Sequence, residues 1–170
     1  AAFVRAGGIG GVSWNGENNA LTQNNVNSTV SISASGAGAH SNYLVVTNFG
    51  FNIPANAVIN GVKVDLDRSA NVTSLVKDYW IALFDDSSGK HLSISNNKAN
   101  VNAFWPIIDN NQYISYGGAT DNWGAALTPA TVNNRNFAVA VSAQRTSTSG
   151  TVQAKVDHIQ VTVYYSTAGG

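Results

Sequence analysis

One stretch, residues 49–68, constrains the fold of this chain more than any other. In its second half, apolar and charged residues alternate: Val62, Val64 and Leu66 against Lys63, Asp65 and Asp67. Successive side chains of a strand point to opposite faces, so this pattern predicts an antiparallel strand with an apolar inner face and a solvated charge row. Pro54 and the Asn60-Gly61 pair come first and predict a corner. The stretch indicates an all-β domain, but no chemistry.

The rest of the chain repeats this signal. Alternation recurs at 30–34, 137–144 and 151–165, and shorter apolar runs stand at 43–46 and 112–116. The run 76–84 is apolar at both parities, which predicts a central strand covered on both faces. About eight strands separated by turn signals, without a βαβ rhythm, predict a jelly-roll-like β-sandwich of two sheets. Thr128 followed by Pro129 predicts a single short helical turn.

The last strand changes phase. Val152, Ala154 and Val156 share one parity, whereas the apolar residues from Ile159 to Tyr165 have the other. One extra residue must lie between the two sets. We therefore predict a β-bulge near Asp157-His158.

Composition narrows the classes of partner. The chain has 170 residues, nine basic and nine acidic, and a formal net charge of zero. This length suits one domain, and no electrostatic field is available to attract nucleic acid or an anionic membrane. No apolar run approaches the length of a membrane span. Because cysteine is absent, disulfides and Cys-ligated zinc are excluded.

Residues 1–25 differ from the sandwich domain expected over 26–170. They carry five glycines and no sustained period, which predicts an extended N-terminal arm. Its apolar residues are too many for a free tail, so the arm is expected to dock on its own sandwich or on that of a neighbour. The first residue, Ala1, favours removal of an initiator methionine, with signal-peptide cleavage as the alternative.

A search for catalytic and metal-binding patterns finds none. His40, His91 and His158 lie outside any nucleophile motif, and Glu17 is the only glutamate. The runs 85–89 and 121–122 offer hard oxygen atoms without the spacing of a calcium loop. We expect no catalytic residue, no metal site and no cofactor.

Exposed aromatic side chains are the usual platform for carbohydrate on a β-sandwich. Trp105, Tyr113 and Tyr116 are the candidates for such a platform. The competing interpretation has Trp105 and Trp123 closing the two ends of the sandwich, with one or both tyrosines in the core.

Five motifs, in this order, carry a resemblance: FGFNIPANAVINGVKVDLDR (49–68), VKDYWIALF (76–84), YGGATDNWG (116–124), LTPATVNNRNFAVAV (127–141) and KVDHIQVTVYY (155–165). The chain resembles, over roughly residues 14–166, a β-sandwich domain that recurs in structural proteins of tailed bacteriophages, of the head-decoration and fibre type. The resemblance implies a virion protein without catalytic residues. It does not extend to the glycine-rich arm.

Three functional hypotheses follow. The first is a non-enzymatic capsid decoration or fibre-base subunit on the virion surface, which binds the capsid or another virion protein. It would be a homo-oligomer, with a trimer favoured. Its attachment arm would use Phe3, Val4, Arg5, Ile9 and Val12. The second is a tail-fibre module that binds a cell-surface receptor or glycan. The third is a secreted, extracellular filament subunit whose arm completes the sheet of a neighbour by strand addition.

Overall fold

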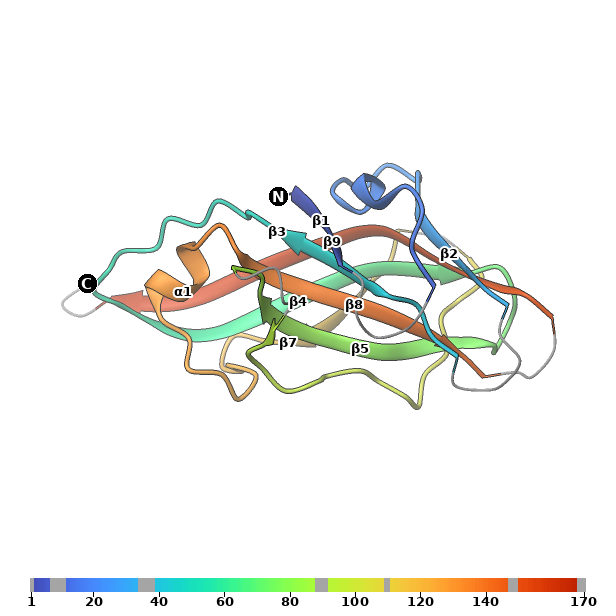
Figure 1. Ribbon diagram of the computed structural model, residues 1–170. Coiled ribbons are helices and arrows are strands. Elements are labelled where there is room, and N and C mark those ends of the chain that lie inside the picture. The colour runs from blue at the N-terminus through green and yellow to red at the C-terminus, as the bar shows by residue number, and fades with distance from the viewer. Residues whose placement is uncertain are drawn as a thin grey trace.

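Two antiparallel sheets lie face to face in the computed structural model, which describes residues 2–6, 12–33, 39–87, 92–108, 111–146 and 150–167 (Figure 1). The first sheet has the order β1 (Ala2–Ala6), β3 (Tyr43–Thr47), β8 (Phe137–Arg145), β5 (Val76–Asp85) and β6 (Leu92–Ser93). The second has the order β2 (Ser28–Ile32), β9 (Val152–Thr167), β4 (Ala57–Ala70) and β7 (Tyr113–Gly117). The predicted all-β sandwich is confirmed.

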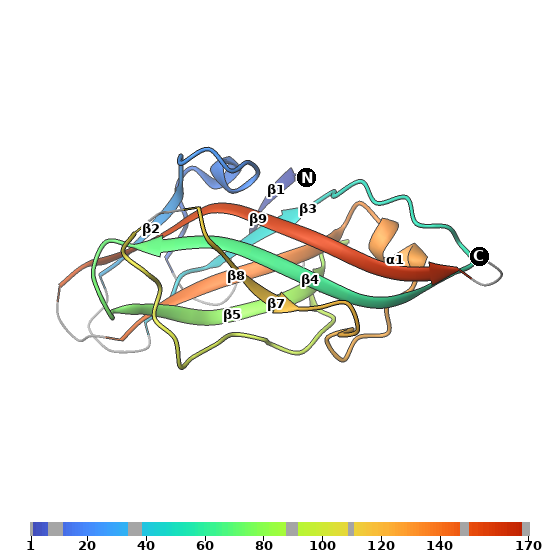
Figure 2. The ribbon, with the colours of Figure 1, turned by 180° about the vertical axis from the view of Figure 1, so that it is seen from behind.

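The pairing is that of a jelly roll. With β1 set aside, β2 pairs with β9, β3 with β8, β4 with β7 and β5 with β6. The first half of the chain thus pairs with the second half in reverse order, and the long hairpin is rolled into two layers. Seen from behind, β4 and β9 run side by side along the molecule (Figure 2).

The N-terminal segment belongs to this body. β1 pairs antiparallel with β3, from Ala2 opposite Thr47 to Ala6 opposite Tyr43. Further on, Trp14 is only 3% exposed, and its indole Nε1 donates to the Asn42 carbonyl at 2.9 Å. A 3₁₀ turn, η1 (Glu17–Ala20), was not predicted from the sequence. In the single chain, the described residues of the arm lie on its own sandwich, which is the first of the two docking modes left open.

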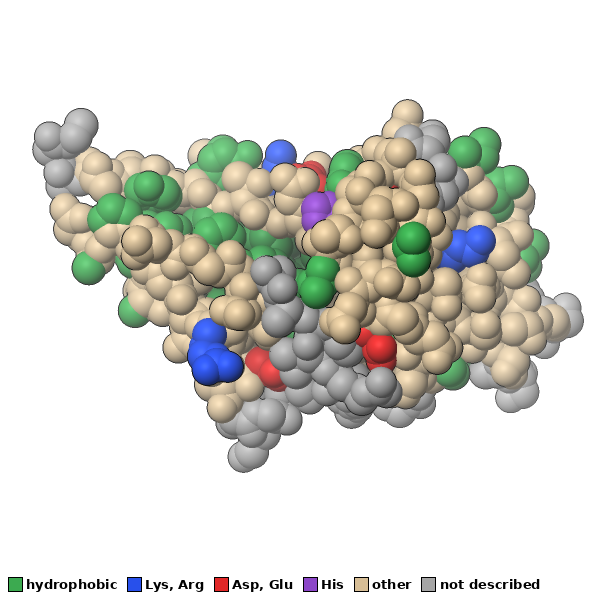
Figure 3. Space-filling view, turned by 90° about the horizontal axis from the view of Figure 1, so that it is seen from above, with side chains coloured by type: hydrophobic (Ala, Val, Ile, Leu, Met, Phe, Trp, Pro, Cys, Tyr) green, Lys and Arg blue, Asp and Glu red, His purple; other side chains and the backbone are tan. Residues whose placement is uncertain are grey.

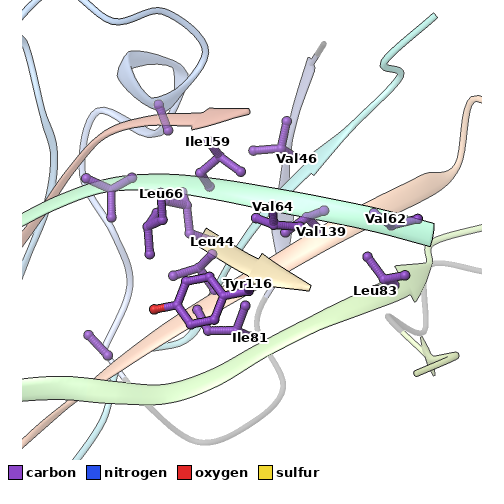
Figure 4. Packing of buried hydrophobic residues seen from close by; sticks show 14 of the residues in the cluster. Leu44, Val46, Val62, Val64, Leu66, Ile81, Leu83, Tyr116, Val139 and Ile159 are labelled. Carbon is purple, nitrogen blue, oxygen red and sulfur yellow. The ribbon is translucent and has the colours of Figure 1, made fainter. Parts of the chain in front are cut away.

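The core lies between the sheets (Figure 4). Val62, Val64 and Leu66 of β4 point inward, as their alternation predicts. Opposite them lie apolar residues of β3, β5 and β8: Leu44, Val46, Ile81, Leu83 and Val139. Ala82 and Phe84 are buried in a second cluster with Val45, so β5 is covered on both faces as predicted.

The solvated charge row predicted on β4 is wrong for two of its three members. Asp67 is 2% exposed and Asp65 is 9% exposed. Gln23 Nε2 donates to Asp67 Oδ2 at 3.3 Å, and Ser115 Oγ donates to Asp65 Oδ1 at 2.5 Å. The segment after η1 and strand β7 supply these donors, so the outer face of β4 is hydrogen-bonded instead of hydrated.

The predicted β-bulge is confirmed. Asp67 pairs with His158 and Arg68 pairs with Val156, which leaves Asp157 as the extra residue of β9. The bulge places the Asp157 carboxylate against the chain before β2, where it accepts from Asn24 N at 3.2 Å and Asn25 N at 2.9 Å. Two further register shifts were not predicted: at Asn60 in β4 the buried parity changes from Ile59 to Val62, and at Tyr79 in β5 it changes from Val76 to Ile81.

One end of the sandwich is closed by α1 (Pro129–Asn133) and the loop before it. As predicted, Thr128 caps this helix, its hydroxyl accepting from Thr131 N at 3.2 Å. The Asn133 side chain binds both backbone groups of Ile53 at 2.9 Å. Trp123 is buried before the helix, with its Nε1 donating to the Val62 carbonyl at 2.8 Å.

The surface is poor in charge. Figure 3 shows one face that consists mostly of uncharged polar side chains and backbone, with few charged groups. In the described part of the chain, no helix has the length and apolar character needed to cross a lipid bilayer.

Candidate functional site

A groove of about 640 Å³ lies beside the segment 104–108, which follows β6, and the start of β7. Its lining includes Arg68, Thr73, Ser74, Phe104, Trp105, Pro106, Ile107, Ile108, Gln112, Tyr113 and Ile114. Ala70 N donates to the Pro106 carbonyl at 2.8 Å, so the end of β4 holds this segment in place.

The groove exposes large apolar side chains at unusual density. Phe104, Ile107, Ile108 and Tyr113 are 48%, 53%, 64% and 37% exposed, respectively. Single exposed apolar residues are common on soluble proteins, whereas several around one hollow are typical of an interaction site. The sequence analysis identified only Tyr113 among them. The sequence signal for the other three was the run 104–108, which is apolar without alternation and lies in an otherwise polar stretch. Such a run could have indicated an exposed apolar surface.

A buried carboxylate, that of Asp78, binds two residues of the groove lining, Trp105 and Arg68. Asp78 is fully buried, and its Oδ1 accepts from Trp105 Nε1 at 2.8 Å and lies 3.4 Å from Arg68 Nη1. Its Oδ2 accepts from the Tyr116 hydroxyl at 2.6 Å and from Asn100 N at 2.9 Å. The Arg68 guanidinium also lies 5.6 Å from the centre of the Trp105 ring. A carboxylate with four donors is fully satisfied, which makes this network structural.

This network corrects the aromatic platform predicted from the sequence. Trp105 is 1% exposed and Tyr116 is 6% exposed, so neither ring can stack on a ligand. Burial, and after it the neighbouring Asp78 carboxylate, raises the pKa of the Tyr116 phenol far above its ordinary value. Both polar tips reach Asp78, which is why these large side chains can be buried. Of the predicted platform, only Tyr113 lies at an exposed position.

Tyr113 is held by the bulged strand. Its hydroxyl lies 2.8 Å from His158 Nδ1, and the two rings meet edge to face at 5.8 Å. Burial lowers the pKa of the His158 imidazole, against a smaller opposing effect of Asp157. In the neutral ring with its proton on Nε2, Nδ1 accepts a hydrogen bond from the Tyr113 hydroxyl, whereas protonation of the ring turns Nδ1 into a donor to that hydroxyl. The Tyr113 hydroxyl can donate or accept, so this contact is available in both protonation states of His158.

The lowered pKa of the buried His158 imidazole gives a first prediction. The unfolded chain protonates His158 near pH 6.5, the ordinary value, whereas the folded ring protonates only at lower pH. Stability is therefore lost as the pH falls below about 6.5, until the folded pKa is passed. Between about pH 7.5 and pH 5.5, the free energy of unfolding should fall more for the wild type than for His158→Gln, as measured by denaturant titration. Parallel pH curves for the two proteins would refute this.

Two further titratable residues, Asp121 and His40, also have structural partners. Asp121 accepts from Trp123 N at 2.8 Å and lies 2.6 Å from Lys98 Nζ, which lowers its pKa. His40 stacks on Tyr79 at 4.1 Å. Among the described residues, no three His, Asp or Glu side chains gather where they could hold a metal ion.

The proposed attachment residues are distributed unevenly. Phe3, Val4 and Arg5 lie in β1, within its ladder to β3. Val12 is 40% exposed, and its backbone is bound to the chain just before β3. Ile9 lies outside the described residues.

No family model and no curated protein matches the chain. Among solved structures, one described as "CBM4 structure and function" matches the chain. It is 12% identical, the match covers 84% of this chain and 87% of that chain, and the TM-score is 0.43. We draw no functional conclusion from so distant a likeness.

Proposed function

We propose that this protein is a non-enzymatic building block of the surface of a tailed-bacteriophage virion, a head decoration or fibre-base subunit, and that its groove holds an apolar segment of a neighbouring virion protein. The observation that carries the binding role is the gathering of Phe104, Ile107, Ile108 and Tyr113 around one hollow. The motif order from residue 49 to residue 165 supports the virion context.

The charge of the groove favours an uncharged, apolar partner. Among the described residues of the lining, Arg68 alone is formally charged, and its guanidinium is 3.4 Å from the Asp78 carboxylate and largely buried. A charged ligand would lose hydration without gaining a free counter-charge. Aliphatic side chains of a partner would instead bury the exposed faces of Ile107 and Ile108, and buried apolar area stabilises a complex.

The prediction concerns incorporation into particles. A variant with Ile107→Ser and Ile108→Ser is added to particles that lack this protein. The bound amount should be at least about tenfold lower than for the wild type, because burial of each isoleucine side chain contributes roughly 1 kcal/mol or more to the binding free energy. Quantitative mass spectrometry of purified particles measures the bound amount.

The matched control is Val58→Ser. Val58 is 62% exposed but lies at the opposite end of β4 from Arg68. It should incorporate like the wild type. If the double variant also incorporates normally, then the groove is not the attachment surface.

A carbohydrate ligand is the second candidate, favoured by the exposed rings of Phe104 and Tyr113 next to the polar Gln112 and Ser74. Sugars stack on aromatic faces, so Tyr113→Ala should abolish binding on a glycan array, whereas the isoleucine double variant should retain it. Tyr165→Ala, which removes an exposed tyrosine outside the groove, is the control. A silent array with the wild type would reject this candidate.

A further inference from the structure

We propose that β1, which pairs with β3 of its own chain in the single subunit, is exchanged between copies, so that Ala2–Ala6 of one subunit pairs with β3 of the next and joins the copies into a homo-oligomer. The interaction surface is the outer edge of β3, and the partner is a second copy of this chain. This proposal is independent of the role assigned to the groove.

The first argument is that β1 is surplus to the fold. The eight strands from β2 to β9 complete the jelly roll among themselves. β1 is added outside this set, with β3 as its neighbour in the sheet. A strand that only extends an edge can be supplied by another molecule without any change in the order of the remaining strands.

The second argument is that the edge of β3 needs a strand. Leu44, Val45 and Val46 are fully buried, and each lies opposite a residue of β1. Without β1, this apolar strand would present unpaired N–H and C=O groups at the edge of the sheet, which is a strong template for strand addition. Because the chains are identical, a β1 from a second copy offers the same backbone groups in the same register.

The third argument concerns the connection between β1 and the body. Residues 7–11, which read Gly-Gly-Ile-Gly-Gly, join β1 to the body. The body begins at Val12, which donates to the His40 carbonyl at 3.2 Å and accepts from Asn42 N at 2.8 Å. Six Cα–Cα steps from Ala6 to Val12 span at most about 20 Å. The β3 edge of the receiving copy must therefore lie within that reach of Val12, which requires subunits that are side by side.

The absence of cysteine from the sequence allows a direct test. Val4 and Val45 are Cα partners in the ladder between β1 and β3. Two chains of different tag length, one with Val4→Cys and the other with Val45→Cys, are expressed together and oxidised. A disulfide between them can form in the native ladder only if β1 of one chain lies on β3 of the other.

The expected result is a mixed covalent dimer on a non-reducing gel, at least about tenfold above the control pair Val4→Cys with Val58→Cys. The neighbouring register pair, Phe3→Cys with Val46→Cys, should behave in the same way. If neither pair exceeds the control, the proposal is overturned. In that case, a single chain that carries both cysteines of a pair, such as Val4→Cys with Val45→Cys, would form the disulfide within itself.

Light scattering gives a second, independent readout. A chain without residues 1–6 should remain folded, with a cooperative unfolding transition, and should have the mass of a monomer, whereas the full chain has the mass of an oligomer. A full-length monomer would also overturn the proposal. If the Ile107→Ser, Ile108→Ser variant loses particle binding but keeps the mass of the oligomer, then the groove binds the particle and β1 joins the copies independently.

Discussion

Asp78→Ala should lower the free energy of unfolding by about 3–5 kcal/mol, the cost of breaking a buried ion pair by removing one partner. The Asp78 carboxylate accepts from Trp105, Tyr116 and Asn100 and lies next to Arg68. Its removal leaves a buried guanidinium without a counter-charge and several buried donors without an acceptor. The measurement is equilibrium unfolding in denaturant.

Two variants delimit this prediction. Lys63→Ala removes the cation of a partly exposed pair, in which Nζ lies 3.5 Å from Asp65 Oδ2, and should cost less than about 1 kcal/mol. Tyr116→Phe removes one donor to Asp78 and should cost an intermediate amount, roughly 1–3 kcal/mol. A loss below about 1 kcal/mol for Asp78→Ala would mean that water reaches the network and replaces the carboxylate.

Gly117→Ala should destabilise the protein by about 3–5 kcal/mol, from backbone strain and overpacking together. Gly117 ends β7 with φ of 75°, a conformation that residues with a Cβ rarely adopt. A Cβ there would also meet the Val62 carbonyl and the Trp123 indole. These two groups are joined by a hydrogen bond of 2.8 Å, so neither can move without loss of that bond.

Two other glycines separate these effects. Gly150 has φ of 73° and open space around the Cβ position, so Gly150→Ala should show the backbone strain alone, about 1–2 kcal/mol. Gly118, the next residue, has neither constraint, and Gly118→Ala should be close to neutral. Thermal unfolding should therefore rank the variants with Gly117→Ala as the least stable. Equal losses at Gly117 and Gly150 would exclude the steric contribution.

The strands could be predicted from the sequence because each carries its own evidence. Val62, Val64 and Leu66 alternate in parity, and the parity change after Val156 is sufficient to locate the bulge at Asp157. Such signals are local, since the two faces of one strand meet different surroundings. The jelly-roll-like class followed from the number of strands and the spacing of their turns, whereas the order of the strands in each sheet did not.

The candidate site could not be predicted in the same way, because its residues depend on partners distant in the sequence. Trp105 and Tyr116 look like an exposed platform until Asp78 is seen to accept from both. Asp67 looks solvated until Gln23, forty-four positions earlier, is found beside it. In each case a polar group lowers the cost of burial, and neither composition nor period reveals that pairing.

The long ladder between β4 and β9 has a practical consequence for any surface-based measurement. It runs from Ala70 opposite Ala154 to Ala57 opposite Thr167, and Arg68 marks the end with the groove. Eleven residues separate Ala57 from Arg68, which in a strand is about 36 Å. A biotin or fluorophore attached at position 167 therefore lies at the far tip of the molecule from the groove. A sensor chip that captures the protein by this tip would leave the groove facing the solution.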